Sequence, residues 1–313
     1  MLDWNVSLMT LENVGILFAY LAAGYLLRQI RALPENADTV MSRLVTYLFC
    51  PAYSIATLSQ SMTAENLSGN LTMFAFGALI IAAAFVLSFL LGKPLGRSPF
   101  ERKSLIYAFA ITNFGYFGYP VVGGVFGAKA LADMMIFCIP ITLVTNTVGY
   151  MLFAPKGSYS LKKILCSPLV LAVFIGIMIG LSGLQLPGFA LGILNGAGSC
   201  MSPVSMILAG YVLGELSIKE LVQGFRPYLY SALRLICIPI LFVLILWIAG
   251  LRNMYLMIPG LYLALPLGMN LVVFPASFGY DTRDNAKMCF ISLLMSVITV
   301  PIMFGILYQI SGL

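Results

Sequence analysis

Several stretches of this chain are longer than a membrane-spanning helix and contain no charged side chain. They cover residues 66–92, 104–128, 253–280 and 288–313. A helix needs about 20 apolar residues to cross a bilayer, and lipid offers the backbone no hydrogen-bond partner, so only helices and closed barrels span it. Hydrophobic residues make up 61% of the chain and charged residues 9%, against about 25% charged in soluble domains. Because the sequence also lacks the alternation typical of barrel strands, it predicts an all-α integral membrane protein.

Charged and turn-rich segments divide the chain into ten predicted transmembrane helices. The charge-free stretch 164–214 is too long for one span, and the turn-forming sequence at 184–188 divides it in two. The predicted helices lie near residues 10–30, 38–60, 69–92, 102–126, 130–154, 167–185, 189–213, 226–250, 254–276 and 286–311. All ten belong to one membrane transporter domain over residues 1–313, because the loop at 157–163 between its halves is too short to hold a further domain.

The Lys and Arg residues predict how these helices are oriented. The chain has 17 of them; Lys129 and Arg252 fall on one side of the predicted helices, which leaves 15 on the other side. Lys and Arg collect in cytoplasmic loops, so we expect both termini outside the cell membrane and the 157–163 loop inside. The net charge of +6 therefore follows membrane topology, and the expected partner is the lipid bilayer and not nucleic acid.

The order of Pro and Asn residues is similar in the two halves of the chain. Pro51 and Pro203 lie in the second and seventh predicted helices, and Asn113 and Asn270 lie in the fourth and ninth. An odd number of helices turns the second copy upside down, which gives an inverted repeat of the kind common in transporters. The two expected five-helix repeats cover about residues 1–155 and 164–313. The alternative is chance placement of Pro in a chain that has 16 of them.

The fourth and ninth predicted helices are each interrupted by Gly, Pro and Asn. Pro removes a backbone hydrogen bond from a helix, and irregular backbone at membrane depth survives only within protein or beside a water-filled cavity. A pair of such interruptions at corresponding positions is the best sequence indication of a transporter's substrate site. The candidate substrate-binding residues are Thr112, Asn113, Gly115, Tyr116, Gly118 and Pro120 in the first interruption, Pro266, Gly268, Asn270 and Pro275 in the second, and Asn146 in the fifth predicted helix.

The sequence Asn-Phe-Gly-Tyr-Phe-Gly-Tyr-Pro at 113–120 and the spacing of Pro266 and Asn270 resemble the auxin efflux carrier family of transporters. The Leu-Phe-Cys-Pro sequence at 48–51 and the small and hydroxyl residues before Pro301 also resemble this family. The resemblance covers essentially the whole chain.

This resemblance implies a fold similar to that of the sodium/bile-acid symporters. Helices 1, 2, 6 and 7 would form a scaffold domain, and helices 3–5 and 8–10 a core domain in which the broken helices 4 and 9 cross. It further implies transport of small organic acids, with some members linked to amino acids, by an elevator-type or rocking alternating-access mechanism. Two copies would be able to associate as a homodimer through the scaffold helices. Pro275 departs from the family, whose members often carry Ala there, so that Pro275 is an alternative to Gly268 as the start of the second half of helix 9.

The side chains of the two interruptions suit a carboxylate substrate. Asn113 and Asn270 each offer two amide donors and an acceptor oxygen, and free N–H groups at the start of a half-helix favour an anion. The alternative is that each Asn caps the backbone of its own interruption. Thr112 and Tyr116 are weaker candidates on the first interruption. Other polar residues that could line the core, or bond to nearby backbone, are Thr142, Ser292 and Ser296.

Ionisable side chains are scarce inside the predicted helices. The chain has no His, and no Asp or Glu lies deep inside a predicted helix, whereas proton-driven carriers usually hold an ionisable residue at depth. Arg234 lies about eight residues into the eighth predicted helix. Its stem is long enough to reach the membrane surface; the alternative is that it attracts anions at an inner vestibule. The six Cys residues form no CxxC pair, so we expect neither a metal nor another cofactor.

These features favour a secondary carrier that moves a small organic anion, a carboxylate or an amino-acid-like molecule, by export or uniport. Coupling to sodium or protons is an alternative, and a receptor or scaffold with a transporter-like fold is a less favoured one. A membrane enzyme is disfavoured, because the nearest acidic pair, Asp281 and Asp284, stands beside Arg283 and Lys287 in a chain without His. The sequence therefore predicts a transporter and not an enzyme.

Overall fold

The computed structural model describes residues 4–63, 67–155 and 167–313, and these residues form helices and no strand. The β-type pairing found among them is an isolated antiparallel bridge between Thr112 and Leu267. The predicted all-α class is therefore confirmed. The basic loop predicted at 157–163 lies outside the described residues.

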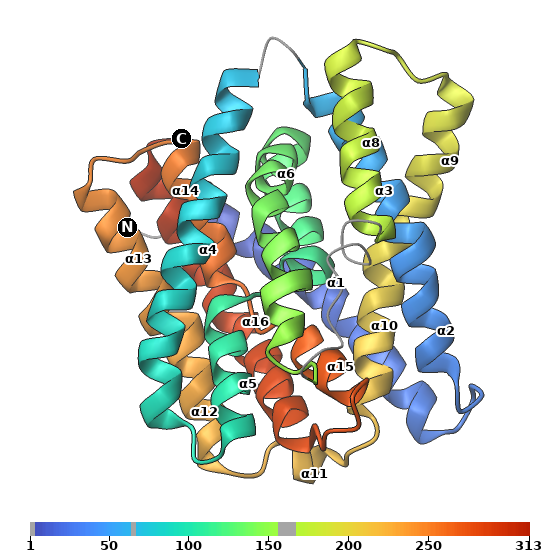
Figure 1. Cartoon of the computed structure of the whole chain (residues 1–313), viewed down its shortest axis with the longest axis vertical. Coiled ribbons are helices and arrows are strands. Elements are labelled where there is room, and N and C mark those ends of the chain that lie inside the picture. Colours follow the sequence, from blue (N-terminus) through green and yellow to red (C-terminus); the bar gives the residue numbers. More distant parts are fainter. Residues whose placement is uncertain (1–3, 64–66, 156–166) are drawn as a thin grey trace.

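Most of the longer helices run roughly along the longest axis of the molecule (Figure 1). Elements labelled η are π-helical turns, and each predicted range overlaps one or more of the observed elements. The elements are α1 (Trp4–Gln29), α2 (Ala37–Leu44), η1 (Val45–Phe49), α3 (Cys50–Ser61), α4 (Leu67–Leu95), α5 (Pro99–Ala110), η2 (Phe114–Gly118), α6 (Tyr119–Val144), η3 (Thr145–Gly149), α8 (Pro168–Ser182), α9 (Gly188–Ser199), α10 (Met201–Leu213), α11 (Ile218–Leu221), α12 (Phe225–Ala232), η4 (Leu233–Cys237), α13 (Ile238–Ile248), α14 (Met254–Ala264), α15 (Asn270–Ala276) and α16 (Arg283–Ser311).

Six helical stretches in the described part of the chain are long and apolar enough to cross a membrane. They are Trp4–Gln29, Leu67–Leu95, Phe114–Gly149, Gly188–Leu213, Phe225–Ile248 and Arg283–Ser311. The third of these stretches bends at Gly127, whose φ of 80° and ψ of −176° are not helical, so the fourth and fifth predicted helices meet at this residue. Helices α8 and α14 are also apolar but shorter.

Three of the π-helical turns end one residue before an X-Pro step, at Pro51, Pro120 and Pro239. Proline has no N–H for the carbonyl four residues earlier, and its ring crowds that carbonyl; the wider π turn, which is frequent at functional sites, makes room for it. The carbonyl of Tyr116, which Pro120 leaves without its usual donor, accepts a hydrogen bond from the Ser202 hydroxyl at 3.4 Å. The positions of the prolines thus explain where these helices widen.

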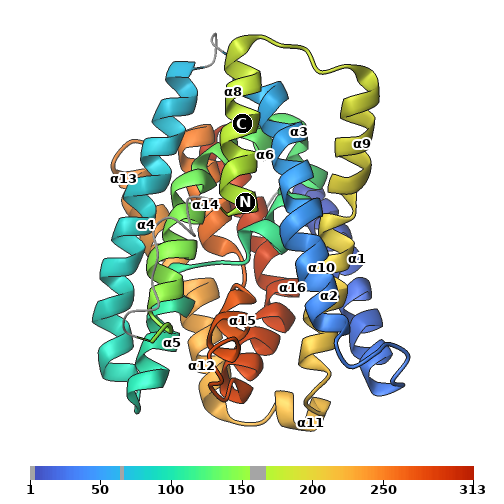
Figure 2. The same ribbon diagram turned by 45° about the vertical axis from the view of Figure 1, so that its right-hand side comes forward.

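The loops collect at two opposite ends of the molecule. The connections α1–α2, α4–α5, α10–α12 and α15–α16 lie at the lower end, and the α8–α9 connection lies at the upper end (Figure 1, Figure 2). Ion pairs at the lower end join Arg28 to Glu215 at 3.1 Å and Arg226 to Glu101 at 2.6 Å. The side to which the sequence assigns most positive residues therefore corresponds to one end of the bundle.

The two predicted helix interruptions lie in the middle of the bundle. The turn η2, which follows the first interruption, contacts α10 and α14, and α15, which follows the second, contacts α5 and α16. Segments from both halves of the chain therefore surround the interruptions, and this arrangement positions the site described next.

Candidate functional site

The two interruptions are hydrogen-bonded to each other through their backbones. The N–H of Asn113 donates to the carbonyl of Pro266 at 2.8 Å, and Thr112 forms the antiparallel bridge with Leu267. Backbone groups that leave a helix at membrane depth need partners inside the protein, and here each interruption provides some of the partners of the other. The two broken helices are therefore held together at their breaks.

Local sequence explains why each helix stops where it does. Leu265 follows the last residue of α14 and is extended, with φ −72° and ψ 153°, as expected for a residue that precedes proline. A Cβ atom on Gly268 would lie 3.0 Å from the backbone oxygen of Thr112, and a Cβ on Gly118 would collide with the side chain of Leu265. Glycine at these two positions allows the breaks to approach this closely.

Side chains from neighbouring helices bond to further backbone groups at the breaks. The hydroxyl of Ser292 accepts the N–H of Leu267 at 3.0 Å, and the amide of Asn285 donates to the carbonyl of Leu271 at 2.9 Å. Ser292 thus supports the second break and is not among the residues that line the cavity. The hydroxyl of Ser296 donates to a carbonyl of its own helix at 2.6 Å.

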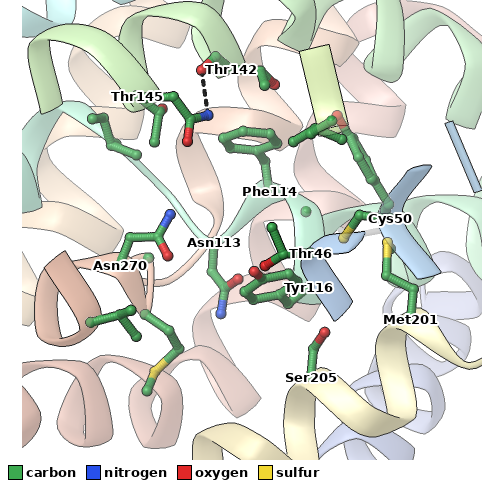
Figure 3. A pocket seen from close by; sticks show the side chains of 18 of the residues that line it. Thr46, Cys50, Asn113, Phe114, Tyr116, Thr142, Thr145, Met201, Ser205 and Asn270 are labelled. Atoms are coloured by element: carbon green, nitrogen blue, oxygen red, sulfur yellow. Dashed lines mark hydrogen bonds between the residues drawn. The ribbon is translucent and has the colours of Figure 1, made fainter. Parts of the chain in front are cut away.

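A cavity of about 260 Å³ lies against both breaks. Figure 3 shows it with Asn113 and Asn270 on the breaks, Thr46 and Cys50 from the second predicted helix, and Ser205 from α10. The described residues that line it include none with a charge. The polar ones are Ser42, Thr46, Tyr53, Ser54, Tyr107, Thr112, Asn113, Tyr116, Tyr119, Thr142, Thr145, Asn146, Ser167, Ser205 and Asn270.

Seven of the eleven candidate residues line this cavity: Thr112, Asn113, Gly115, Tyr116, Asn146, Gly268 and Asn270. The other four do not line it. Gly118 packs against Leu265, Pro120 lies in the first turn of α6, and Pro266 offers its carbonyl to Asn113. Pro275, the fourth, is buried at the far end of α15.

Asn113 is the side chain that stands out chemically. It is 3% exposed, and its Nδ2 has no hydrogen-bond partner among the described residues. Its backbone carbonyl accepts from the N–H groups of Phe117 at 3.2 Å and Gly118 at 2.9 Å, but its side chain makes no capping bond to η2. A buried donor of this kind carries the full cost of lost hydration, so the geometry fits a group that meets a ligand better than it fits a cap.

The other two Asn candidates differ from Asn113. Asn270 is half-buried and is the first residue of α15, whose N-cap, Met269, makes no side-chain cap bond. The Nδ2 of Asn146 already donates to the carbonyl of Thr142 at 2.8 Å, within its own helix. Asn146 can therefore offer the cavity its amide oxygen more readily than its amide nitrogen.

The second half of the ninth predicted helix begins at Asn270 and not at Pro275. Helix α15 runs from Asn270 to Ala276, with Pro275 next to its last residue. The carbonyl of Pro275 accepts the N–H groups of Phe278 at 3.0 Å and Tyr280 at 3.1 Å. Pro275 as a start of the half-helix was therefore wrong, because this proline closes the segment that Gly268 opens.

Sequence reasoning missed several hydroxyl residues of the cavity, among them Thr46, Thr145 and Ser205. The hydroxyls of Thr145 and Ser205 are buried and have no partner within the described ranges. All three lie in helices that are apolar on most faces, so hydrophobic periodicity could not show that these side chains face a cavity. For Thr46 the available signal was the proline five residues later, which widens the helix there.

Arg234 is buried, contrary to the expectation that it reaches the membrane surface. Its side chain is 0% exposed, and the η4 turn that carries it contacts α13, α14 and α16. Its Nη1 donates to the carbonyl of Leu263 at 2.6 Å, while Nε and Nη2 have no partner in the described part of the chain. It does not line the cavity, so it lies behind the breaks, where neighbouring helices block the path of its stem to the surface.

An uncharged cavity at the junction of two interrupted helices, within a protein of many apolar helices, is the site expected of a membrane transporter. Comparison with known proteins agrees: the model of the family described as "Membrane transport protein" matches residues 9–162 and 157–304. The chain belongs to this family, which confirms the predicted resemblance to the auxin efflux carriers.

Two archaeal proteins are similar to this chain along nearly its whole length. An uncharacterised transporter of Methanothermobacter thermautotrophicus is 24% identical over 299 residues, which cover 93% of this chain and 96% of that protein. An uncharacterised transporter of Methanocaldococcus jannaschii is 25% identical over 304 residues, which cover 93% of this chain and 97% of that protein. The chain is thus a multi-pass membrane protein of a transporter family.

Proposed function

We propose that this chain is a secondary transporter of a small organic anion, a carboxylate or an amino-acid-like molecule. The observation that carries the proposal is the buried amide of Asn113, which has no partner among the described residues. It lies at the wall of a cavity where two helix breaks meet and whose described lining residues carry no charge. A group of this kind gains a partner when a substrate with acceptor oxygens enters, so substrate binding removes the free-energy cost of a buried donor without a hydrogen bond.

The chemistry around the cavity favours a negative substrate. The described residues that line it include no acidic side chain that would repel an anion, and the turn that begins at Phe114 places the positive end of a helix dipole at the break. Arg234 adds a positive charge behind the second break. A cavity of about 260 Å³ is at the small end of ligand pockets, which limits the substrate to a small molecule.

In the proposed topology the chain crosses the cell membrane ten times as two inverted five-helix repeats, with both termini outside. The bend at Gly127 supports this count, because it divides one long apolar stretch into two helices. The cavity extends from the breaks to Ser42 and Val212, toward the end that carries most positive residues. Under the positive-inside rule this is a cytoplasm-facing state.

The packing of the helices supports an elevator-type or rocking motion. Helix α1 packs on α10, and α3 packs on α8 and α9, which would make one unit of helices 1, 2, 6 and 7. Helix α4 packs on α5 and α6, while α12 and α14 pack on α16, which would make the other unit. The cavity is lined by both groups, so a movement of one against the other would change the side from which it is reached. Dimerisation through the first unit is part of the proposal.

A binding measurement followed by an uptake measurement tests the proposed function. A thermal-unfolding screen of the purified protein against organic acids and amino acids should reveal a ligand, because one at 100 times its dissociation constant adds about 2.7 kcal/mol to the free energy of unfolding. The same compound should then enter proteoliposomes that contain the protein at a saturable rate. A ligand that binds tightly but does not cross would favour a receptor with a transporter-like fold.

A further inference from the structure

Arg234 lies at the C-terminal end of a half-helix, beside the crossing of the two breaks. Its Nη1 donates to the carbonyl of Leu263, the penultimate residue of α14. The last four carbonyls of a helix have no partner within the helix and form the negative end of its dipole. In transporters with broken helices, the C-terminal ends of half-helices and the unwound carbonyls are where a coupling cation is held.

At the corresponding end of the other broken helix, the last carbonyl accepts a hydrogen bond from a neutral group. The carbonyl of Ala110, the last residue of α5, accepts a hydrogen bond from the neutral hydroxyl of Tyr262 at 3.1 Å. One half-helix end thus receives a neutral donor and the other a full positive charge. In the described part of the chain no ion pair joins Arg234 to a carboxylate, and two of its nitrogens have no partner.

This arrangement is more than a capping hydrogen bond requires. A neutral donor suffices at Ala110, whereas an ionised side chain at membrane depth is costly and is usually retained for function. Residue 234 is nine positions from the start of α12, about 14 Å along the helix at 1.5 Å per residue, which puts the charge near the level of the breaks. The charge of Arg234, in addition to its N–H groups, therefore needs a role.

We propose that Arg234 is a built-in cation that occupies the carbonyl-rich end of α14 in place of a bound sodium ion, so that substrate transport needs no coupling cation. This proposal extends the proposed function, and its transport measurements rest on that function. Because the anion then crosses without a co-transported positive charge, its movement carries net charge across the membrane.

The experiment compares the full-length protein with R234Q, R234K and R252Q. R234Q removes the charge but keeps an amide donor, and R234K keeps the charge. R252Q is the matched control, because Arg252 also donates to a carbonyl at a helix end, that of Trp247 at 2.9 Å, and to the carbonyl of Leu251 in the loop that follows at 2.7 Å, but is exposed. Thermal unfolding is measured in sodium chloride, in N-methylglucamine chloride of equal ionic strength, and with millimolar guanidinium added.

The expected results separate a role of the charge from a role in packing. The native protein and R252Q unfold at the same temperature in both salts, whereas R234Q unfolds earlier and regains about 2–4 °C with guanidinium or sodium. R234K remains folded and independent of sodium. The proposal is overturned if the unfolding temperature of R234Q responds to neither guanidinium nor sodium. If R234Q cannot be purified, R234K decides, and an R234K protein that is unstable or depends on sodium overturns the proposal.

A transport arm completes the test. Uptake by the native protein should be unchanged when N-methylglucamine replaces sodium, and R234Q should transport at least about tenfold more slowly. Uptake that requires sodium contradicts the built-in cation while leaving the transporter function intact. If no organic anion is transported at all, the proposed function fails, but the unfolding measurements still decide what the charge of Arg234 does.

Discussion

Replacing Asn113 with Ala separates a substrate-binding Asn from a structural one. In the empty protein the Nδ2 of Asn113 is buried without a partner, a state that costs about 1–3 kcal/mol. The lost side chain faces an existing cavity, so its removal leaves no new void within packed side chains. N113A without substrate should therefore unfold at the same temperature as the native protein or up to about 3 °C higher.

Substrate binding should respond in the opposite direction. A hydrogen bond to a charged group contributes about 1.5–3 kcal/mol, and 1.4 kcal/mol corresponds to a factor of ten. N113A should therefore bind an organic anion about 10- to 150-fold more weakly. Thermal unfolding of the purified protein over a range of substrate concentrations measures both effects in one assay.

Two further Asn to Ala substitutions serve as controls for N113A. Asn195 is an exposed residue of α9, and N195A should change neither stability nor binding. Asn146 already donates to Thr142, so N146A should weaken binding less than N113A does. The reasoning is refuted if N113A lowers the unfolding temperature of the empty protein while binding stays normal, since that result is the one expected of a cap.

Three other predictions follow from the geometry. N270A should also reduce uptake strongly while membrane insertion stays normal, and near-normal uptake would remove Asn270 from the site. G268A adds a methyl group 3.0 Å from the Thr112 backbone oxygen and should lower stability by about 1–3 kcal/mol, whereas G196A, with open space around it, should not; equal unfolding temperatures would contradict the close crossing. A fluorescent protein that matures only in the cytoplasm should be dark after Leu313 and bright when inserted at residue 157, and a bright C-terminal fusion on an inserted protein would overturn the ten-helix topology.

The breaks could be predicted from the sequence because the residues that make them have strong backbone preferences. Pro266 and Gly268 cannot continue a regular membrane helix without new partners, and the same holds for the Gly-rich run that ends at Pro120. The structure places both interruptions where the sequence puts them and joins them through Asn113 and Pro266. The placement of Lys and Arg in the loops predicts an orientation through a rule of membrane insertion, and that orientation stays a prediction.

The facing of individual side chains could not be predicted in the same way. A helix that is apolar on all sides has no periodic signal to show which face meets a cavity, so Ser205 and Thr145 were missed. Pro275 was given as an alternative start because it stands where members of the family often carry Ala, but in α15 it lies next to the end. Arg234 was expected to extend to the surface because its stem is long enough to do so. Its burial could not be predicted, because the helices that enclose it, α14 and α16, are distant in sequence.

The measurement that tests the central claim most directly is anion flux under an imposed membrane potential. Proteoliposomes with an inside-positive potassium diffusion potential should accumulate the organic anion found in the binding screen. One charge moved across 100 mV is worth about 2.3 kcal/mol, which permits about 50-fold accumulation, and N113A should abolish most of this flux. In a cell with an inside-negative potential the same coupling would favour export. Flux that ignores the potential but follows a pH gradient, or that is unchanged in N113A, would contradict an uncoupled anion carrier with its site at the crossing of the two breaks.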